Sequence, residues 1–335
     1  MTGTHRITTL TFPTQEYVSR QYGDARIDCY VTEPARGVSA ATGFLLLIHG
    51  WGNDGRAAYE ADSIAFADTH DLVVTRVEYR HSGREVLHPE PGLTFDRPYD
   101  FSKLQTIDCL RAAKATLDHY PVLDRRRMIL WGGSQGAHIA AQCLVFAPSV
   151  WSAAILCCGL YHPYTYKQQW EAGYAFDIVQ RPGFGFVEYA LGPGRDYPEQ
   201  HEVEIRSPRR NAALMPAGAP IAVIHGTRDD NVDIRHAVEL YARLLALGKS
   251  ARFAAIANGD HGLTGAEAAD EDSRFKATQK YASDLFALTR EANGEPWPTQ
   301  STVIPVTGGR YEVHFEREGA ALRFDADTDV GTTGA

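Results

Sequence analysis

Gly132-Gly133-Ser134-Gln135-Gly136 is the stretch of sequence that decides the fold. It directly follows the apolar run 128–131 and opens a run, 134–146, whose small residues would let a helix lie close against a sheet. A serine at a tight turn from strand to helix holds its hydroxyl clear of the backbone, and such a turn leaves room for little beyond glycine beside it. The stretch therefore predicts a nucleophile elbow at Ser134. The alternative is that Ser134 only caps the helix.

The composition is that of a globular protein. The chain has 335 residues, 44% hydrophobic and 22% charged, which suits one large domain with an appendage. A formal charge of -9 argues against nucleic acid or an anionic membrane as the main partner. Five cysteines without a C-x-x-C pair indicate neither a disulfide framework nor a zinc site. No signal-peptide core or membrane-length apolar run is present, so we expect a soluble, cytoplasmic protein; self-association into a homo-oligomer stays open.

Apolar runs of strand length alternate with helical periodicity from about residue 44 to 293. This alternation is typical of a parallel sheet that is covered by helices on both faces. Two further strands, 7–12 and 26–32, are expected to pair antiparallel at one edge of the sheet. The predicted core strands are 44–49, 72–79, 128–131, 153–157, 221–225 and 252–257, and the predicted helices are 101–119, 134–146, 234–247 and 275–290.

The same patterns divide the chain into parts. We expect an α/β domain over residues 1–295, with an insertion at about 160–219 that is rich in Gly, Pro and aromatic residues and forms a cap. Residues 296–326 alternate in polarity around Gly-containing turns, which predicts a small β-meander. Residues 327–335 are expected to be a flexible tail.

A serine nucleophile needs a base, and the base needs a carboxylate that orients it. His225-Gly226-Thr227-Arg228-Asp229-Asp230-Asn231-Val232 places Asp229 in a loop after a predicted strand, at the end of the sheet where open α/β folds hold their sites. His261 follows the next predicted strand in the same way. Asp230 is the alternative acid, while the strand-end histidines His49 and His225 are interpreted as structural.

These motifs resemble those of the α/β-hydrolases, particularly the branch of prolyl oligopeptidases, dienelactone hydrolases and acetyl xylan/cephalosporin C deacetylases. The elbow with its doubled glycine, the 225–232 turn and the 260–262 loop carry the resemblance, which covers about residues 20–290. It implies an α/β-hydrolase fold with a mostly parallel, doubly wound sheet, a cap insertion and a Ser134-His261-Asp229 triad. It implies no metal and no organic cofactor.

An oxyanion hole needs two N–H groups directed at the developing charge. The amide of Gln135, directly after the nucleophile, is expected to be the first. The loop 49–53 resembles the oxyanion loop of the family, and the match makes the amide of Trp51 the second. Aromatic residues of the insertion are expected either to line an acyl or aromatic substrate pocket or only to cover the core: Tyr161, Trp170, Phe184 and Phe186.

The leading functional hypothesis is a serine hydrolase of small carboxylic esters, an esterase or deacetylase that forms an acyl-enzyme on Ser134. Its expected partner is a small-molecule ester substrate. The second hypothesis is a peptidase or amidase of the prolyl oligopeptidase type. It ranks lower because too few residues precede the first core strand for the large N-terminal propeller that those enzymes usually carry. The third is an acyltransferase or a non-hydrolytic ligand-binding use of the fold.

Overall fold

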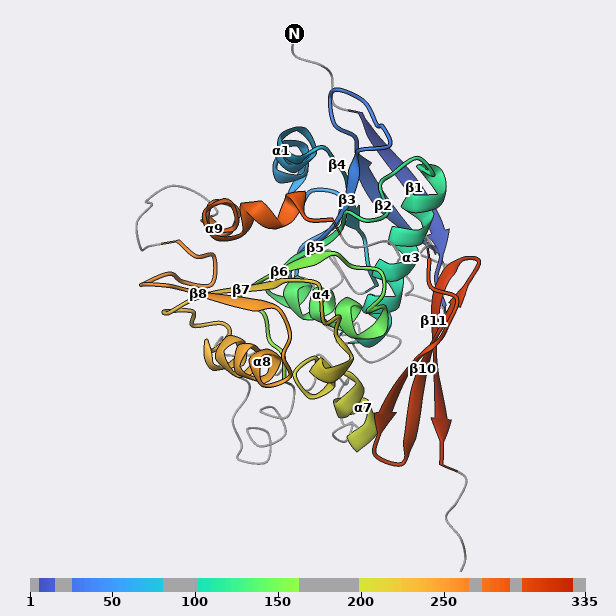
Figure 1. Ribbon diagram of the computed structural model, residues 1–335, viewed down its shortest axis with the longest axis vertical. Coiled ribbons are helices and arrows are strands. Elements are labelled where there is room, and N and C mark those ends of the chain that lie inside the picture. Colours follow the sequence, from blue (N-terminus) through green and yellow to red (C-terminus); the bar gives the residue numbers. More distant parts are fainter. Residues whose placement is uncertain are drawn as a thin grey trace, which may run out of the picture.

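The computed structural model describes residues 6–15, 26–80, 100, 102–162, 199–264, 273–289 and 297–327. Its large sheet is built from β1 (Ile7–Pro13), β2 (Arg26–Thr32), β3 (Gly43–Ile48), β4 (Leu72–Val77), β5 (Met128–Gly133), β6 (Ala153–Cys157), β7 (Ile221–Gly226) and β8 (Ala251–Ile256). The strand order is β1-β2-β4-β3-β5-β6-β7-β8 (Figure 1). Pairs from β4 to β8 are parallel, whereas β1 and β2 join antiparallel at one edge. This is the predicted α/β-hydrolase fold, which is confirmed.

Helices cover both faces of this sheet. The covering helices are α1 (Glu60–His70), α3 (Lys103–His119), α4 (Gln135–Phe146), α8 (Arg235–Ala246) and α9 (Ser273–Ala282), with the 3-10 turn η2 (Ser283–Ala287). The short helix α7 (Gln200–Ile205) packs on the 3-10 turn η1 (Arg210–Leu214). Side chains alternate across a strand, so each strand feeds two separate cores. Leu46 packs in the cluster that includes α3, α4 and α8, while Leu45 packs in the cluster that includes α1, α9 and η2. Strands β3 to β7 are buried throughout for this reason.

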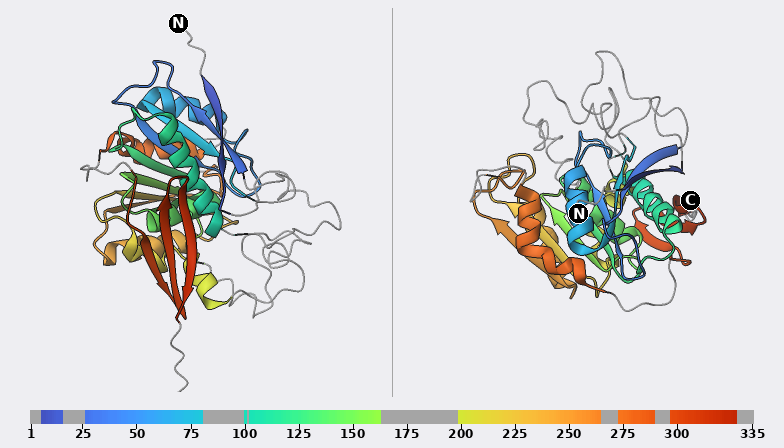
Figure 2. Two further views of the ribbon diagram at one scale, coloured as in Figure 1. Left: turned by 90° about the vertical axis from the view of Figure 1, so that its right-hand side faces the viewer. Right: turned by 90° about the horizontal axis from the view of Figure 1, so that it is seen from above.

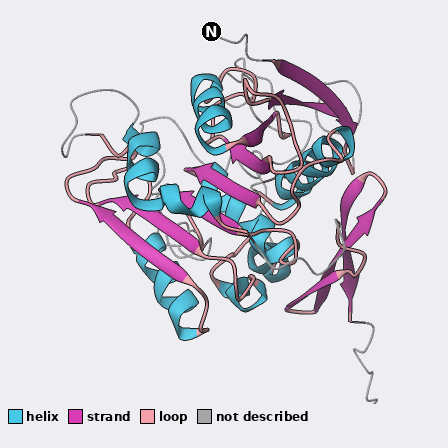
Figure 3. Cartoon of the chain, turned by 45° about the horizontal axis from the view of Figure 1, so that its top comes forward, coloured by secondary structure: helices cyan, strands magenta, loops and turns pink. Residues whose placement is uncertain are grey.

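A second, three-stranded antiparallel sheet is formed by β9 (Thr302–Val306), β10 (Gly309–Glu316) and β11 (Gly319–Ala326), as the 296–326 pattern predicts. It is separate from the large sheet (Figure 3), and Figure 2 (left) shows its red strands in front of the green helix α3. Its apolar face joins the main core through Ile304, Tyr311 and Val313. Arg111 of α3 also donates a hydrogen bond from Nε to the carbonyl oxygen of Ala320 at 2.6 Å. The small sheet therefore shares its core with the large domain.

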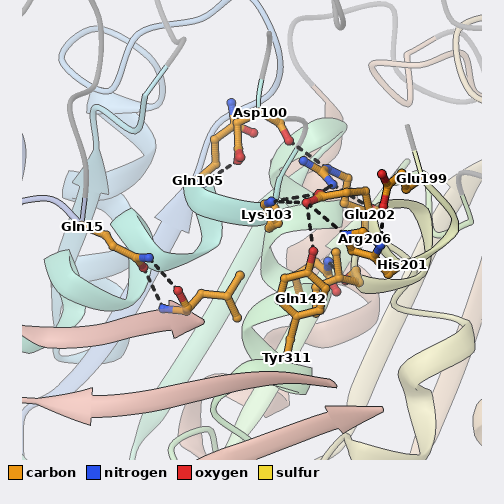
Figure 4. Close-up of polar contacts among 12 residues, drawn as sticks. Gln15, Asp100, Lys103, Gln105, Gln142, Glu199, His201, Glu202, Arg206 and Tyr311 are labelled. Carbon is orange, nitrogen blue, oxygen red and sulfur yellow. Dashed lines mark hydrogen bonds and ion pairs between the residues drawn. The ribbon is translucent and has the colours of Figure 1, made fainter. Parts of the chain in front are cut away.

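A partly buried carboxylate ties the small sheet to two helices (Figure 4). Glu202 of α7 accepts hydrogen bonds from Lys103 Nζ of α3 at 2.8 and 2.9 Å and from the hydroxyl of Tyr311 at 2.9 Å, and it pairs with Arg206. Burial alone would raise the pKa of Glu202, but the nearby charges of Arg206 and Lys103 and their hydrogen bonds lower it to about 2. Glu202 is therefore ionised at neutral pH and connects three elements.

The structure corrects one predicted helix. The run 275–290 is not a single helix, because α9 ends at Ala282 and the tighter turn η2 follows. In η2, Leu285 and Phe286 are buried, and the Phe286 ring lies 4.9 Å from that of Phe66 on α1. Packing against α1 thus overrides the continuous helical pattern. Helix α1 itself was not among the predicted elements, and most of the predicted cap, 163–198, and the tail 328–335 lie outside the described residues.

Candidate active site

Ser134 lies at a strained turn between β5 and α4. Its φ of 57° and ψ of -124° are values that residues with a side chain rarely adopt, and they occur at nucleophile elbows. A Cβ atom at Gly132 would lie 2.2 Å from the carbonyl oxygen of Gly136, and one at Gly136 would lie 2.1 Å from that of Ile48, so neither glycine can be replaced without moving the backbone. The Ser134 side chain makes no capping hydrogen bond to α4, which contradicts the alternative of a helix cap.

The loops that follow β7 and β8 are held together by backbone contacts. The N–H of Arg228 donates to the carbonyl oxygen of Gly259 at 2.8 Å, and that of Thr227 donates to Ile256 at 3.0 Å. A Cβ atom at Gly226 would lie 2.3 Å from the carbonyl oxygen of Gly259, so the approach needs glycine here. These contacts bring the Asp229 loop and the His261 loop side by side at the C-terminal ends of their strands.

Ser134, His261 and Asp229 form a hydrogen-bonded line. The Nε2 atom of His261 lies 2.8 Å from Ser134 Oγ, and its Nδ1 atom lies 2.9 and 2.8 Å from the two carboxylate oxygens of Asp229. A carboxylate only accepts, so Nδ1 carries the hydrogen and Nε2 is free to accept the serine proton. The Asp229 side chain is fully buried, whereas Asp230 is exposed, so the structure places Asp229 and not Asp230 against the histidine.

Asp229 is held in its ionised form by the hydrogen bonds that surround it. Burial by itself would raise the pKa of this carboxyl, but hydrogen bonds from His225 and His261 and the backbone N–H of Val232 lower it far below its usual range. The carboxylate is therefore charged wherever the chain is folded near neutral pH, and it is available to stabilise an imidazolium.

Arg274 holds the His261 loop from the side of α9. Its Nε and Nη2 atoms both donate to the backbone carbonyl oxygen of His261, at 2.9 and 2.7 Å, and Nη1 lies 3.3 Å from the hydroxyl of Tyr59. The Tyr59 ring in turn packs edge-on against Trp131 of β5, with ring centroids 5.1 Å apart. We did not predict Arg274 as part of the site, because an arginine in a helical run carries no signal of the loop that it contacts.

The two expected oxyanion amides lie on the backbone segments next to Ser134. Gln135 is the first residue of α4, and its side chain donates from Nε2 to Oε1 of Gln105 at 2.9 Å. The loop that contains Trp51 also passes the nucleophile, since a Cβ atom at Gly50 would lie 3.1 Å from Ser134 Cβ. The assignment of these two amides stays a prediction.

Of the remaining residues named from the sequence, His49 and Tyr161 are described by the structure and three others are not. His49 is buried, stacks on Tyr79 with centroids 4.3 Å apart and has its pKa lowered to about 4 by burial, which agrees with a structural role. Tyr161 is fully buried in the main core, and its expected place in a substrate pocket stays a prediction. Three expected pocket residues lie outside the described residues: Trp170, Phe184 and Phe186.

The fold and the Ser134-His261-Asp229 geometry define a serine hydrolase of the α/β-hydrolase class. The family model of the prolyl oligopeptidase family matches residues 102–288, which is more than half of the chain. The chain therefore belongs to the prolyl oligopeptidase family. Among curated proteins it is similar to the uncharacterized peptidase YuxL of Bacillus subtilis (strain 168), with 23% identity over 182 residues that make up 54% of this chain and 24% of that protein.

Solved structures show the same fold. The acylaminoacyl peptidase of Pyrococcus horikoshii superposes with a TM-score of 0.65 at 18% identity, covering 87% of this chain and 43% of that one. A puromycin-hydrolyzing peptidase of Mycobacterium tuberculosis superposes with a TM-score of 0.63 at 15% identity, covering 86% and 40%. This chain thus spans less than half the length of these relatives, and at such identities the likeness establishes the fold alone.

Proposed function

We propose that this serine hydrolase is a peptidase or amidase, in which Ser134 is the nucleophile, His261 the general base and Asp229 the residue that orients the base. The single observation that carries the proposal is the hydrogen-bonded line from Ser134 Oγ through the His261 ring to both oxygens of Asp229. Membership of the prolyl oligopeptidase family and the peptidase names of the relatives favour amide bonds over the small esters that we expected first.

The geometry supports acyl transfer in two halves. His261 Nε2 takes the hydroxyl proton as Ser134 Oγ attacks the carbonyl carbon, and the new imidazolium gives that proton to the leaving amine as the C–N bond breaks. A water molecule then attacks the acyl-enzyme, with His261 again accepting a proton and returning it to Ser134 Oγ as the acid leaves. The amides of Gln135 and Trp51 would donate to the oxyanion in both halves.

Substrates that share one acyl group test the proposal best. We would compare an N-acyl-aminoacyl 4-nitroanilide, the 4-nitrophenyl ester of the same acyl group, and 4-nitrophenyl butyrate. A peptidase is expected to cleave the anilide and to favour the aminoacyl ester over the butyrate by at least about tenfold in kcat/KM, or about 1.4 kcal/mol in transition-state binding. All three activities should disappear in Ser134→Ala.

Two outcomes would replace the proposal. Hydrolysis of the butyrate with no anilide cleavage above the Ser134→Ala background would restore the ester hypothesis. Labelling of Ser134 by a fluorophosphonate without turnover of any of the three substrates would favour acyl transfer to another acceptor, since the phosphonate needs only an activated serine.

A further inference from the structure

Asp229 is in contact with two histidines. His261 reaches both of its oxygens from the loop after β8, while Nε2 of His225, from β7, lies 3.1 Å from Oδ2. The other oxygen, Oδ1, also accepts the backbone N–H groups of Asn231 at 3.0 Å and Val232 at 2.8 Å. His225 is therefore the only described side chain besides His261 that bonds this carboxylate.

The surroundings of His225 fix which of its nitrogens carries the hydrogen. Its Nε2 atom also lies 2.9 Å from the carbonyl oxygen of Val232, which can only accept, so Nε2 is a donor whose one hydrogen is shared between this carbonyl and Oδ2 of Asp229. Its Nδ1 atom is buried and has no hydrogen-bond partner among the described residues. The ring is fully buried, so both acceptors meet it in a space closed to water. His225 thus acts as a hydrogen-bond donor to both acceptors.

Two other titratable groups among the described residues lie close to this pair, Cys158 and His236. The Cys158 thiol at the end of β6 lies within 4.8 Å of the pair, and burial raises its pKa well above the ordinary value. His236 of α8 interacts electrostatically with His225, and burial lowers its pKa to about 4. Both groups are therefore neutral near pH 7. The negative charge of Asp229 acts on the two imidazole rings, His225 and His261.

We propose that His225 is a positioning residue for the reaction, a buried donor that fixes the Asp229 carboxylate and limits how strongly it attracts the proton on His261. This inference rests on the proposed function of the Ser134-His261-Asp229 line. Without the His225 donor, more of the carboxylate charge acts on His261, so the protonated and inactive form of His261 persists to higher pH. The carboxylate also loses the His225 contact on Oδ2, one of those that fix its orientation, which misaligns the base.

The test compares His225→Gln, whose amide nitrogen can replace Nε2, with His225→Leu and His225→Asn, which cannot reach the carboxylate. We expect the Leu and Asn variants to have a kcat about 10- to 100-fold below that of the parent protein and a KM within about threefold of it. The acid limb of their kcat/KM profile should lie about half a pH unit or more above that of the parent. The kcat of the Gln variant should be at least about tenfold higher than that of the Leu variant, and its acid limb should lie near that of the parent. His236→Gln, a buried histidine on α8 outside the proposed machinery, is the matched control.

Two readouts separate this inference from the proposed function. An activated aryl ester and the rate of fluorophosphonate labelling both report the serine and its base, whichever natural substrate class is correct. An unreactive parent protein would overturn the proposed function itself. A labelled parent whose Leu and Asn variants keep the parent acid limb, whether or not they lose thermal stability, would show that His225 is only a packing residue. His225→Gln being as impaired as His225→Leu would overturn the donor role.

Discussion

The guanidinium of Arg274 donates two hydrogen bonds to the backbone carbonyl oxygen of His261, from Nε at 2.9 Å and from Nη2 at 2.7 Å. The arginine side chain is thus a brace for the loop that carries the base, and it starts from the first turn of α9. Displacing a catalytic group by about 1 Å can cost about 100-fold in rate. The brace should therefore matter to turnover as well as to stability.

Replacing Arg274 with Met is expected to lower kcat/KM by about 10- to 100-fold, because the His261 loop loses both hydrogen bonds while the helix keeps a residue of similar length. Steady-state kinetics per folded enzyme is the measurement. Lys280→Met removes one positive charge from the same helix and should change kcat/KM by less than about threefold. Equal effects of the two substitutions would mean that net charge, and not the contact with His261, is responsible.

Ser134→Ala is expected to abolish turnover and leave the fold intact. The loss in kcat should be on the order of 10³-fold or more, since the base has no nucleophile to activate. The hydroxyl bonds His261 and supports no core contact, so the thermal midpoint should change by no more than about 2 °C. Fluorophosphonate labelling followed by peptide mapping should find Ser134 in the parent protein and no labelled serine in the variant. Residual turnover in pure variant would remove Ser134 from the proposal.

Asp229→Asn should be much more damaging than Asp230→Asn. The amide can donate a hydrogen bond to His261 and favour the wrong tautomer, which is expected to cost on the order of 10³-fold in kcat/KM. Asp230 is exposed and lies one residue away, so it is a matched control that should stay within about threefold of the parent. The opposite ranking in steady-state kinetics would assign the acid to Asp230.

The rate should rise with pH through a single ionisation. Only neutral His261 can accept the serine proton, so kcat/KM is expected to be low when this histidine is protonated and to reach a plateau as it loses the proton. Asp229 adds no second step near neutrality, because its pKa is held far below the usual range. A pH-rate profile from about pH 5 to 8 checks this. A flat profile over that range would argue against a histidine base.

Glu202→Gln should destabilise the protein in a pH-dependent way. The folded pKa of Glu202 is about 2, below its ordinary value of 4.5, so its charge favours folding above pH 4.5 and this contribution disappears as the pH falls from 4.5 toward 2. We expect a loss of about 2 kcal/mol in unfolding free energy at pH 7, shrinking at lower pH. Urea unfolding at several pH values measures it. Glu199→Gln, at an 82% exposed side chain, is the control, and a loss that does not depend on pH would contradict the assignment.

The sequence predicts those parts of the site in which a strand, a glycine and a polar residue follow one another. Ser134, Asp229 and His261 each follow a strand of the parallel part of the sheet, and the parallel order of these strands brings them to one edge. Arg274 could not be predicted, since its contact with His261 depends on how α9 packs against the sheet. The strand-end histidine His225 was recognised only as structural, because its contact with Asp229 depends on how the intervening turn folds.

The helix 275–290 shows the same limit for the fold. Its apolar period is correct as far as Ala282, where the backbone leaves the helix with φ of -143°. What ends it is the packing of Phe286 on Phe66, two side chains far apart in the sequence. No local pattern contains that contact. Boundaries that are set by capping or glycine could be predicted, whereas this one is set by tertiary packing.

The order of the strands also has a consequence for folding during translation. Strands β5, β6, β7 and β8 lie in the sheet in the order in which they are synthesised, so each one can add to the open edge of its predecessor. Ser134 and His261 are 127 residues apart, and the serine leaves the ribosome long before its base. In a nascent chain Ser134 therefore has no base to activate it until β8 is in place. Its reactivity begins only when this half of the sheet has been assembled.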